Sequence, residues 1–165
     1  MRADSIGVLS QAPARLALAA VVAVGGCGVD YGAGTGNNGA VVGNFAGSYL
    51  GTVTQSGACA DGTRLPVQSQ FFALNITQSA TFLRWTADCG VLASATVNGD
   101  TASVQAYSCP PRTVGTQTTQ LSVTGGTLTL QGGALIVNIT GQITLRGAQT
   151  GYCSLAVTGT LARQG

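Results

Sequence analysis

Apolar and polar residues alternate with a period of two along most of the chain after Asn44. In the clearest stretch the residues of one face are apolar or glycine, namely Leu135, Val137, Ile139, Gly141, Ile143 and Leu145. Most of the intervening residues are Thr, Asn or Gln. Because successive side chains of a strand point to opposite faces, this pattern predicts strands with one buried and one solvated face.

The same alternation recurs in three other stretches, which are residues 83–87, 91–97 and 153–161. Val and Thr are frequent in these stretches, and both residue types suit the pleated surface of a sheet. No stretch after the first 26 residues has a helical hydrophobic period longer than two turns. The pattern therefore predicts an all-β fold.

Glycine, asparagine and aspartate mark short connections between these strands. Asn98-Gly99, between Val97 and Asp100, predicts a two-residue type I′ hairpin loop. Short strands joined by short turns favour an up-and-down meander, and closure of the sheet removes its exposed edges. We expect a small antiparallel up-and-down barrel of about eight strands, with a β-sandwich as the alternative.

The positions of the cysteines bear on the number of strands. In a meander successive connections lie at alternate ends, so Cys59, Cys89 and Cys109 share one end. If Gly125-Gly126 is a bulge within one long strand, there are eight strands and Cys153 lies near that end; if it is a turn, there are nine and Cys153 lies at the other end. Disulfide-bonded Cα atoms lie within about 7 Å, which favours eight strands.

The hairpin register decides how these cysteines pair. A loop at Asn98-Gly99 makes Cys89 and Cys109 diagonal neighbours at the open end of the hairpin. We predict a Cys89–Cys109 disulfide and, for the remaining pair, a Cys59–Cys153 disulfide across the seam between the first and last strands. Zinc would require paired CxxC spacing, which is absent, so the cysteines predict no metal site.

The N-terminal segment has a different pattern. Its apolar run from Leu16 to Val24 is nine residues long, which is too short to cross a hydrocarbon core of about 30 Å as a helix. The run follows Arg2 and Arg15 and precedes small residues. A charged region, an apolar region and small residues in this order are typical of an export signal.

Val24-Gly25-Gly26-Cys27 directly follows the apolar run and resembles the bacterial lipobox. The resemblance implies that residues 1–26 are a lipoprotein signal peptide and that Cys27 becomes the acylated N-terminus, which anchors the chain in a membrane. Gly28, where some inner-membrane lipoproteins have aspartate, implies the outer membrane, with the domain facing the periplasm or the cell surface. The alternative is an ordinary secretory signal followed by an unlipidated cysteine.

Residues 27–43 are rich in glycine and asparagine, a composition typical of a flexible tether. The expected organisation is a signal peptide at 1–26, an acylated tether at 27–43 and a β-barrel domain at 44–165. Residues 27–165 contain five Arg, four Asp and no Lys, Glu or His. This nearly neutral balance without a basic run argues against nucleic-acid binding.

The same composition excludes most catalytic mechanisms. Without His or Lys in residues 27–165, there is no Ser-His-Asp or Cys-His arrangement and no Schiff-base lysine. The remaining candidate is a glycosidase-type carboxylate pair, Asp61 and Asp88, which share the cysteine-bearing end. Each lies beside Gly or Cys in an expected turn, where aspartate is a common turn former. We expect neither an enzymatic activity nor a cofactor.

The start of the first strand, Gly47-Ser48-Tyr49, resembles the Gly-x-Trp signature of lipocalins. The resemblance implies a barrel that holds a small ligand. An eight-stranded barrel is wide enough for its own side chains or for one small ligand, and the many small inward residues favour unfilled space. We expect an apolar ligand with a wall formed by Leu83, Trp85, Val137 and Ile139. The alternative is an envelope structural or interaction protein whose polar β surface binds a protein or polysaccharide.

The lipobox resemblance makes a testable prediction about the mature N-terminus. Mass spectrometry of native protein from the membrane fraction should find residues 1–26 absent and acyl chains on Cys27. Retention of Met1 would contradict removal of the leader. A shortened chain with an unmodified Cys27 would support the ordinary secretory signal instead.

Overall fold

The computed structural model describes residues 42–165, which contain ten strands and no helix. The strands are β1 (Gly47–Cys59), β2 (Arg64–Ser79), β3 (Phe82–Thr86), β4 (Leu92–Asn98), β5 (Thr101–Val104), β6 (Tyr107–Ser108), β7 (Arg112–Val114), β8 (Gln117–Gln131), β9 (Ala134–Arg146) and β10 (Gly151–Arg163). All pairings are antiparallel. Residues 42–165 include no helix able to span a bilayer.

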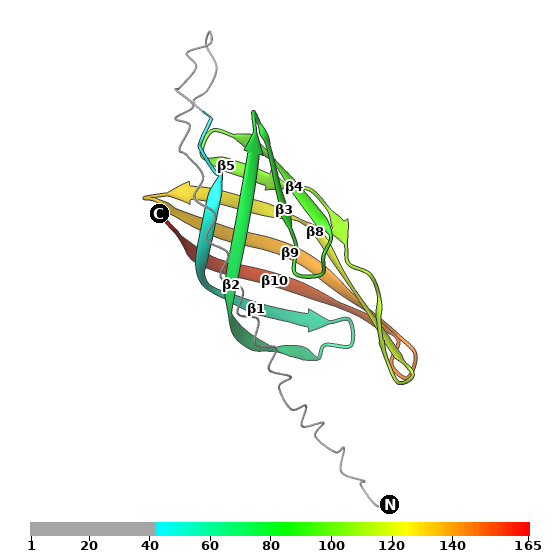
Figure 1. The fold of residues 1–165 in the computed structure, drawn as a ribbon. Coiled ribbons are helices and arrows are strands. Elements are labelled where there is room, and N and C mark those ends of the chain that lie inside the picture. The colour runs from blue at the N-terminus through cyan, green and yellow to red at the C-terminus, as the bar shows by residue number, and fades with distance from the viewer. Residues whose placement is uncertain (1–41) are drawn as a thin grey trace, which may run out of the picture. The chain divides into compact units, whose positions relative to one another are not determined.

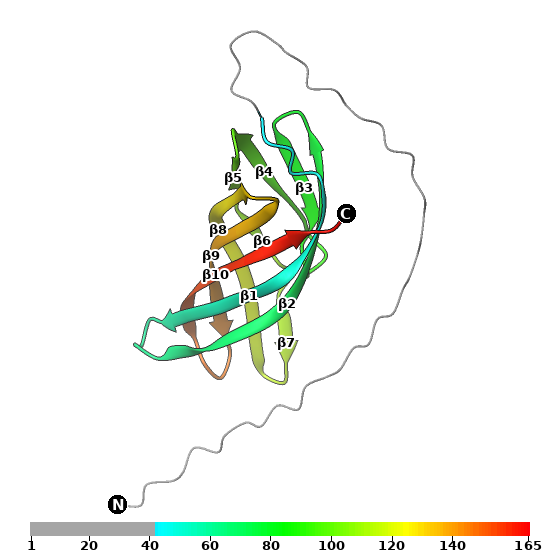
Figure 2. The same cartoon turned by 90° about the vertical axis from the view of Figure 1, so that its left-hand side faces the viewer.

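Eight of these strands form a closed, barrel-like ring (Figure 1). Their order is β5-β4-β3-β2-β1-β10-β9-β8, and a further β5–β8 pairing closes the ring. Figure 2 shows the first and last strands, β1 and β10, side by side. The short strands β6 and β7 pair with the N-terminal part of β8. The predictions of an all-β fold and of an eight-stranded antiparallel ring are confirmed.

The long strand β8 contains the glycine pair whose role decided the strand count. Its register against β9 shifts between Val123 and Gly125, so Gly125-Gly126 is an irregularity inside one strand. Both glycines have positive φ, 154° and 149°. A Cβ on Gly126 would clash with the carbonyl oxygen of Asn138 on β9. Glycine is required here because of the positive φ values and the close approach of the β9 backbone, and the eight-strand interpretation is confirmed.

The β4–β5 loop lies one residue later than predicted, which shifts the pairing of the two strands by two residues. Asn98 pairs with Thr101, so the loop is Gly99-Asp100, and the predicted pairing of Val97 with Asp100 is wrong. Only Gly99 has positive φ in this loop, at 60°. A type I′ turn needs positive φ at both central residues, whereas a glycine at the first central position is typical of type II′.

The largest fully buried aromatic side chains of the core lie at the end of the ring where β1 begins. The core's largest fully buried side chains include Tyr49, Phe45, Leu83, Leu128, Leu135 and Leu161. The Tyr49 hydroxyl donates to the carbonyl oxygen of Phe45 at 3.0 Å. Arg163 lies over the Tyr49 ring, 5.8 Å from its centroid, and donates to the carbonyl oxygen of Ala46. These interactions close this end with satisfied polar groups.

The packed part of the chain begins just before the first strand. The Gly43 N–H donates to the carbonyl oxygen of Gly99 at 2.9 Å, and the Gly43 carbonyl accepts from Gln78 Nε2 at 3.0 Å. Residues 1–41 lie outside the described residues. They include the expected signal peptide, Cys27 and most of the expected tether.

Two disulfides tie the opposite end of the ring. Cys59–Cys153 joins β1 to β10, and Cys89–Cys109 joins the turn after β3 to the segment after β6. Both predicted pairings are confirmed. The hairpin ladder used to predict the second one does not extend to these cysteines, because β4 begins at Leu92 and β5 ends at Val104.

The two disulfides are expected to stabilise the fold unequally. They link residues 94 and 20 positions apart, and the longer closed loop restricts the unfolded chain more. Replacing Cys59 and Cys153 by Ser should lower the free energy of unfolding by about 4–5 kcal/mol, and replacing Cys89 and Cys109 by about 3 kcal/mol. Urea denaturation of both double variants measures the difference. A larger loss for the shorter loop would contradict the expectation.

Candidate functional site

A cavity of about 350 Å³ lies inside the ring, between the Tyr49 end and the Cys89–Cys109 disulfide. Strands β1, β2, β3, β8, β9 and β10 supply its apolar wall, which includes Val53, Leu74, Trp85, Val123, Val137, Ile139, Leu155 and Val157. These residues face inward by the alternation that the sequence predicts. The cavity is therefore a continuation of the core in which the side chains do not fill the ring.

The difference between the filled and hollow parts follows from residue size. Phe45, Tyr49 and Leu83 are fully buried at the filled end. At the hollow end, small residues such as Ala87 and Gly141 line the ring. An eight-stranded ring is about wide enough for side chains to fill, so small inward residues leave space.

Three of the four predicted wall residues line the cavity. Trp85, Val137 and Ile139 are among its lining residues, whereas Leu83 is 0% exposed and lies outside the lining. Leu83 pairs with Gln78, whose side chain accepts a hydrogen bond from the Phe45 N–H. Leu83 is therefore the inward residue of β3 that precedes Trp85, and it lies in the filled end of the ring.

One side of the ring is not hydrogen-bonded along its full length. β2 is 16 residues long and β3 only five, and the two pair only from Thr77 to Ser79 on β2. Gln70 and Phe72 line the cavity on the part of β2 that pairs with β1 but has no β3 partner, and Asp88 lines it from the turn after β3. Gln70 and Asp88 are exposed, so the cavity reaches the surface here.

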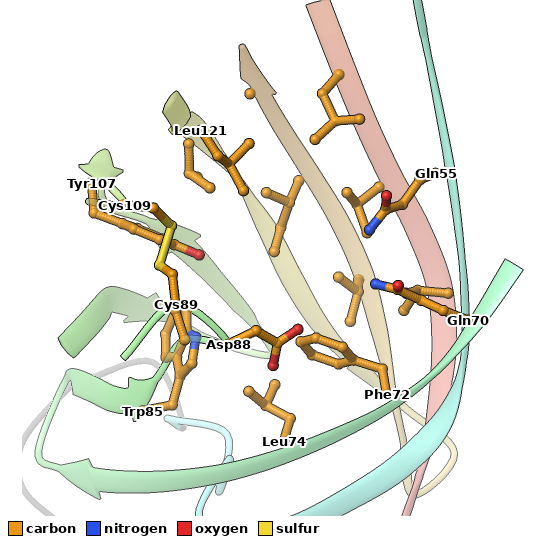
Figure 3. A pocket seen from close by; sticks show the side chains of 18 of the residues that line it. Gln55, Gln70, Phe72, Leu74, Trp85, Asp88, Cys89, Tyr107, Cys109 and Leu121 are labelled. Carbon is orange, nitrogen blue, oxygen red and sulfur yellow. A yellow bond between two sulfur atoms is a disulfide. The ribbon is translucent and has the colours of Figure 1, made fainter. Parts of the chain in front are cut away.

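We call five residues at this opening the cavity mouth, namely Gln70, Phe72, Asp88, Tyr107 and Arg112. Figure 3 shows the Asp88 carboxylate and the Tyr107 hydroxyl directed into the space that Phe72 and Trp85 border. Burial raises the pKa of the Tyr107 phenol, and the negative charge of Asp88 raises it further. Asp88 is therefore close enough for its charge to act on a group inside the mouth.

The alternation of the sequence did not identify Asp88 as a site residue. Continued alternation after Trp85 places Ala87 inward and Asp88 outward. The chain leaves the strand after Thr86, and the Ala87 N–H donates to the carbonyl oxygen of Val91 at 2.8 Å in the turn that follows. The period of two ends with the strand, so the turn redirects Asp88 to the mouth.

Phe72 and Tyr107 were also missed by sequence reasoning. Phe72 follows the inward series of Leu74 and Ile76, so the alternation of β2 contained a signal for it. Tyr107 lies in β6, which is only two residues long and shows no periodicity. Its position depends on the pairing of this short segment with Val123 on β8.

The aspartates that the sequence left as a catalytic candidate are not both at this site. Asp88 lines the cavity and Asp61 does not. Asp61 accepts a hydrogen bond from the Thr63 N–H at 2.9 Å, and this bond lowers the pKa of its carboxyl group. Asp61 thus stabilises the turn between β1 and β2. Residues 42–165 contain no group of three or more His, Cys, Asp or Glu side chains arranged to hold a metal.

No protein-family model and no curated protein matches this chain.

The raised pKa of Tyr107 predicts a loss of stability at alkaline pH. Burial raises the pKa of Tyr49 as well, although nearby Arg163 partly offsets this. A phenol whose pKa is higher in the folded than in the unfolded chain stabilises the fold fully below about pH 10, and this contribution is lost as the pH rises through the folded pKa. Urea denaturation between pH 8 and about 11 should show the decline, and Tyr107→Phe should make it shallower. An unchanged pH profile in Tyr107→Phe would contradict this prediction.

Proposed function

We propose that this chain is an exported binding protein for a small apolar molecule. The observation that carries the proposal is the cavity of about 350 Å³ inside the disulfide-linked ring. Ligand sites are concave and mostly apolar, with a few polar groups, and have volumes of about 300–1,000 Å³. The cavity has this size, and the mouth supplies four of the six polar residues that line it.

The apolar wall supplies the driving force for binding. Val137, Ile139, Leu155 and Val157 present aliphatic side chains to the interior from β9 and β10. Removing apolar surface from water is favourable by about 25 cal/mol per Å². A ligand with an apolar body gains this free energy without displacing any part of the packed core at the Tyr49 end.

The disulfide beside the mouth favours a preformed site. Cys89 and Cys109 both line the cavity, and their bond connects the turn that carries Asp88 to the segment that follows Tyr107. A linkage that holds two loops in the binding conformation reduces the entropy lost on binding.

Export and membrane attachment are part of the proposal. Two disulfides favour an oxidising compartment, which agrees with the export signal expected in residues 1–26. The lipobox resemblance at Cys27 supports a lipid anchor in the outer membrane, and the Gly47-Ser48-Tyr49 resemblance supports a lipocalin-like binder. The chain would then hold its ligand near a membrane surface without catalysing a reaction.

A second candidate function is an envelope protein that binds a protein or polysaccharide partner through its outer face. Val67 and Phe71 on β2 are 70% and 72% exposed, in the part of this strand that has no β3 partner. Exposed apolar side chains beside an unpaired strand edge are typical of interaction surfaces. Recovery of no envelope component with the tethered protein would contradict this second candidate.

Binding of an apolar ligand should be measurable through the single tryptophan. Trp85 lines the cavity, so N-phenyl-1-naphthylamine bound there should quench its emission by energy transfer. In displacement by a series of linear alcohols, each added methylene should raise the affinity about fourfold until the cavity is filled, because each buried methylene contributes about 0.8 kcal/mol. An affinity that does not depend on chain length would contradict the proposal.

A matched pair of variants locates the binding site. Ile139→Trp places a large ring in the cavity and should abolish binding of the naphthylamine probe in calorimetry. Asn138→Trp adds the same side chain on the exposed face of β9 and should leave binding unchanged. Equal binding by both variants would show that the probe binds elsewhere.

A further inference from the structure

The cavity mouth and the adjacent Trp85 combine one carboxylate with three aromatic rings. Trp85, Phe72 and Tyr107 line the same part of the cavity as Asp88, although they come from β3, β2 and β6 (Figure 3). Aromatic rings carry negative charge on their faces and attract cations, and a carboxylate attracts them directly. The four side chains therefore share a preference for one kind of chemical group.

The Asp88 carboxylate is free to bind a ligand. It forms neither a salt bridge nor a hydrogen bond with another residue of the described part of the chain. Its backbone is held on both sides, because the Gly90 N–H donates to the carbonyl oxygen of Ala87 at 2.8 Å and the adjacent Cys89 is disulfide-bonded to Cys109. An unpaired charge on a turn held in this way can recognise a charged ligand group.

The interior behind the mouth is uncharged. The described residues that line the cavity include only two charged side chains, Asp88 and Arg112, and both are exposed at the mouth. A charged group of a ligand would thus stay at the mouth, while the aliphatic wall around Val137 and Ile139 would accept only an apolar body. The site favours a molecule with two chemically different ends.

Arg112 is the one positively charged side chain among the described cavity-lining residues, and by itself it would attract an anion. It lies on β7 and forms no ion pair with Asp88. No second Lys, Arg or His among the described cavity-lining residues could bind a carboxylate together with it. The aromatic rings gather with Asp88 in the view of Figure 3, and they add to the attraction of a cation but not of an anion. The balance at the mouth therefore favours a positively charged group.

We propose that the cavity binds an amphiphilic organic cation. Its ammonium group lies at Asp88, among Phe72, Trp85 and Tyr107, and its apolar chain extends toward Val137 and Ile139. This inference rests on the proposed function, since it names the ligand class of the same cavity. It predicts a preference that a purely apolar pocket would not have.

Three probes with the same alkyl chain and different head groups test the inference. Decyltrimethylammonium, decanol and decanoate would be compared, below their aggregation concentrations, by displacement of N-phenyl-1-naphthylamine from the disulfide-bonded protein. The cation should bind about tenfold more tightly than the alcohol, and decanoate more weakly than the alcohol. Equal binding of the cation and the alcohol would overturn the inference and leave the proposed function intact. Binding of none of the three would contradict the proposed function itself.

Variants at the mouth separate charge from shape. Asp88→Asn should weaken binding of the cation about fivefold and change binding of decanol less than twofold, since an exposed charge contributes modestly. Phe72→Leu keeps an apolar side chain without the ring and should weaken the cation about threefold. Asp100→Asn, which removes an equivalent charge from the β4–β5 loop, is the control and should have no effect. Equal loss of cation and alcohol binding in Asp88→Asn would overturn the role of its charge.

Discussion

Antiparallel hydrogen bonding between the first and last strands of the ring is the constraint on which the rest of the structure depends. The β1–β10 ladder extends from Tyr49 opposite Arg163 to Cys59 opposite Cys153. Close approach of the two backbones requires glycine in this ladder, because a Cβ on Gly159 would lie 2.5 Å from the carbonyl oxygen of Thr52. Once this seam is closed, the inward faces of all eight strands surround one interior, and no long edge remains along the seam.

The interior is divided by the sizes of the side chains that the strands contribute. At one end Tyr49 fills the ring. Its hydroxyl group donates to the carbonyl oxygen of Phe45, and Arg163, which lies over the Tyr49 ring, donates to the carbonyl oxygen of Ala46. At the other end the inward side chains, among them the small residues Ala87 and Gly141, leave a cavity of about 350 Å³. The filled end stabilises the ring, so the hollow end can remain open without loss of the fold. This division explains how a small domain can hold both a core and a binding site.

The chemistry of the mouth follows from the unequal lengths of β2 and β3. Because β3 ends at Thr86 while β2 continues alongside β1, the ring opens at one side, and the turn after β3 carries Asp88 to the edge of the cavity. The Cys89–Cys109 disulfide then fixes this turn beside Tyr107. A strand that stops early thus converts an apolar interior into a site with one defined polar end, which links the fold to the class of ligand that we propose.

The sequence by itself determined the all-β fold, the inward faces of the main strands, the eight-strand count and both disulfide pairs. The fold, the inward faces and the strand count follow from a period of two and from the parity of a meander, which are local features of the chain. The disulfide pairs were predicted correctly because parity brings the four cysteines to one end, although the hairpin register used to pair Cys89 with Cys109 is not the one observed. The period of two also placed Trp85, Val137 and Ile139 on the inward faces that line the cavity. Only the tertiary structure decided that Leu83 lies in the filled core, that the β4–β5 loop is shifted by one residue, and that Asp88 faces the mouth. These three features depend on where a strand stops pairing and on which side chains meet across the ring. The local pattern of apolar and polar residues specifies neither the strand ends nor these contacts.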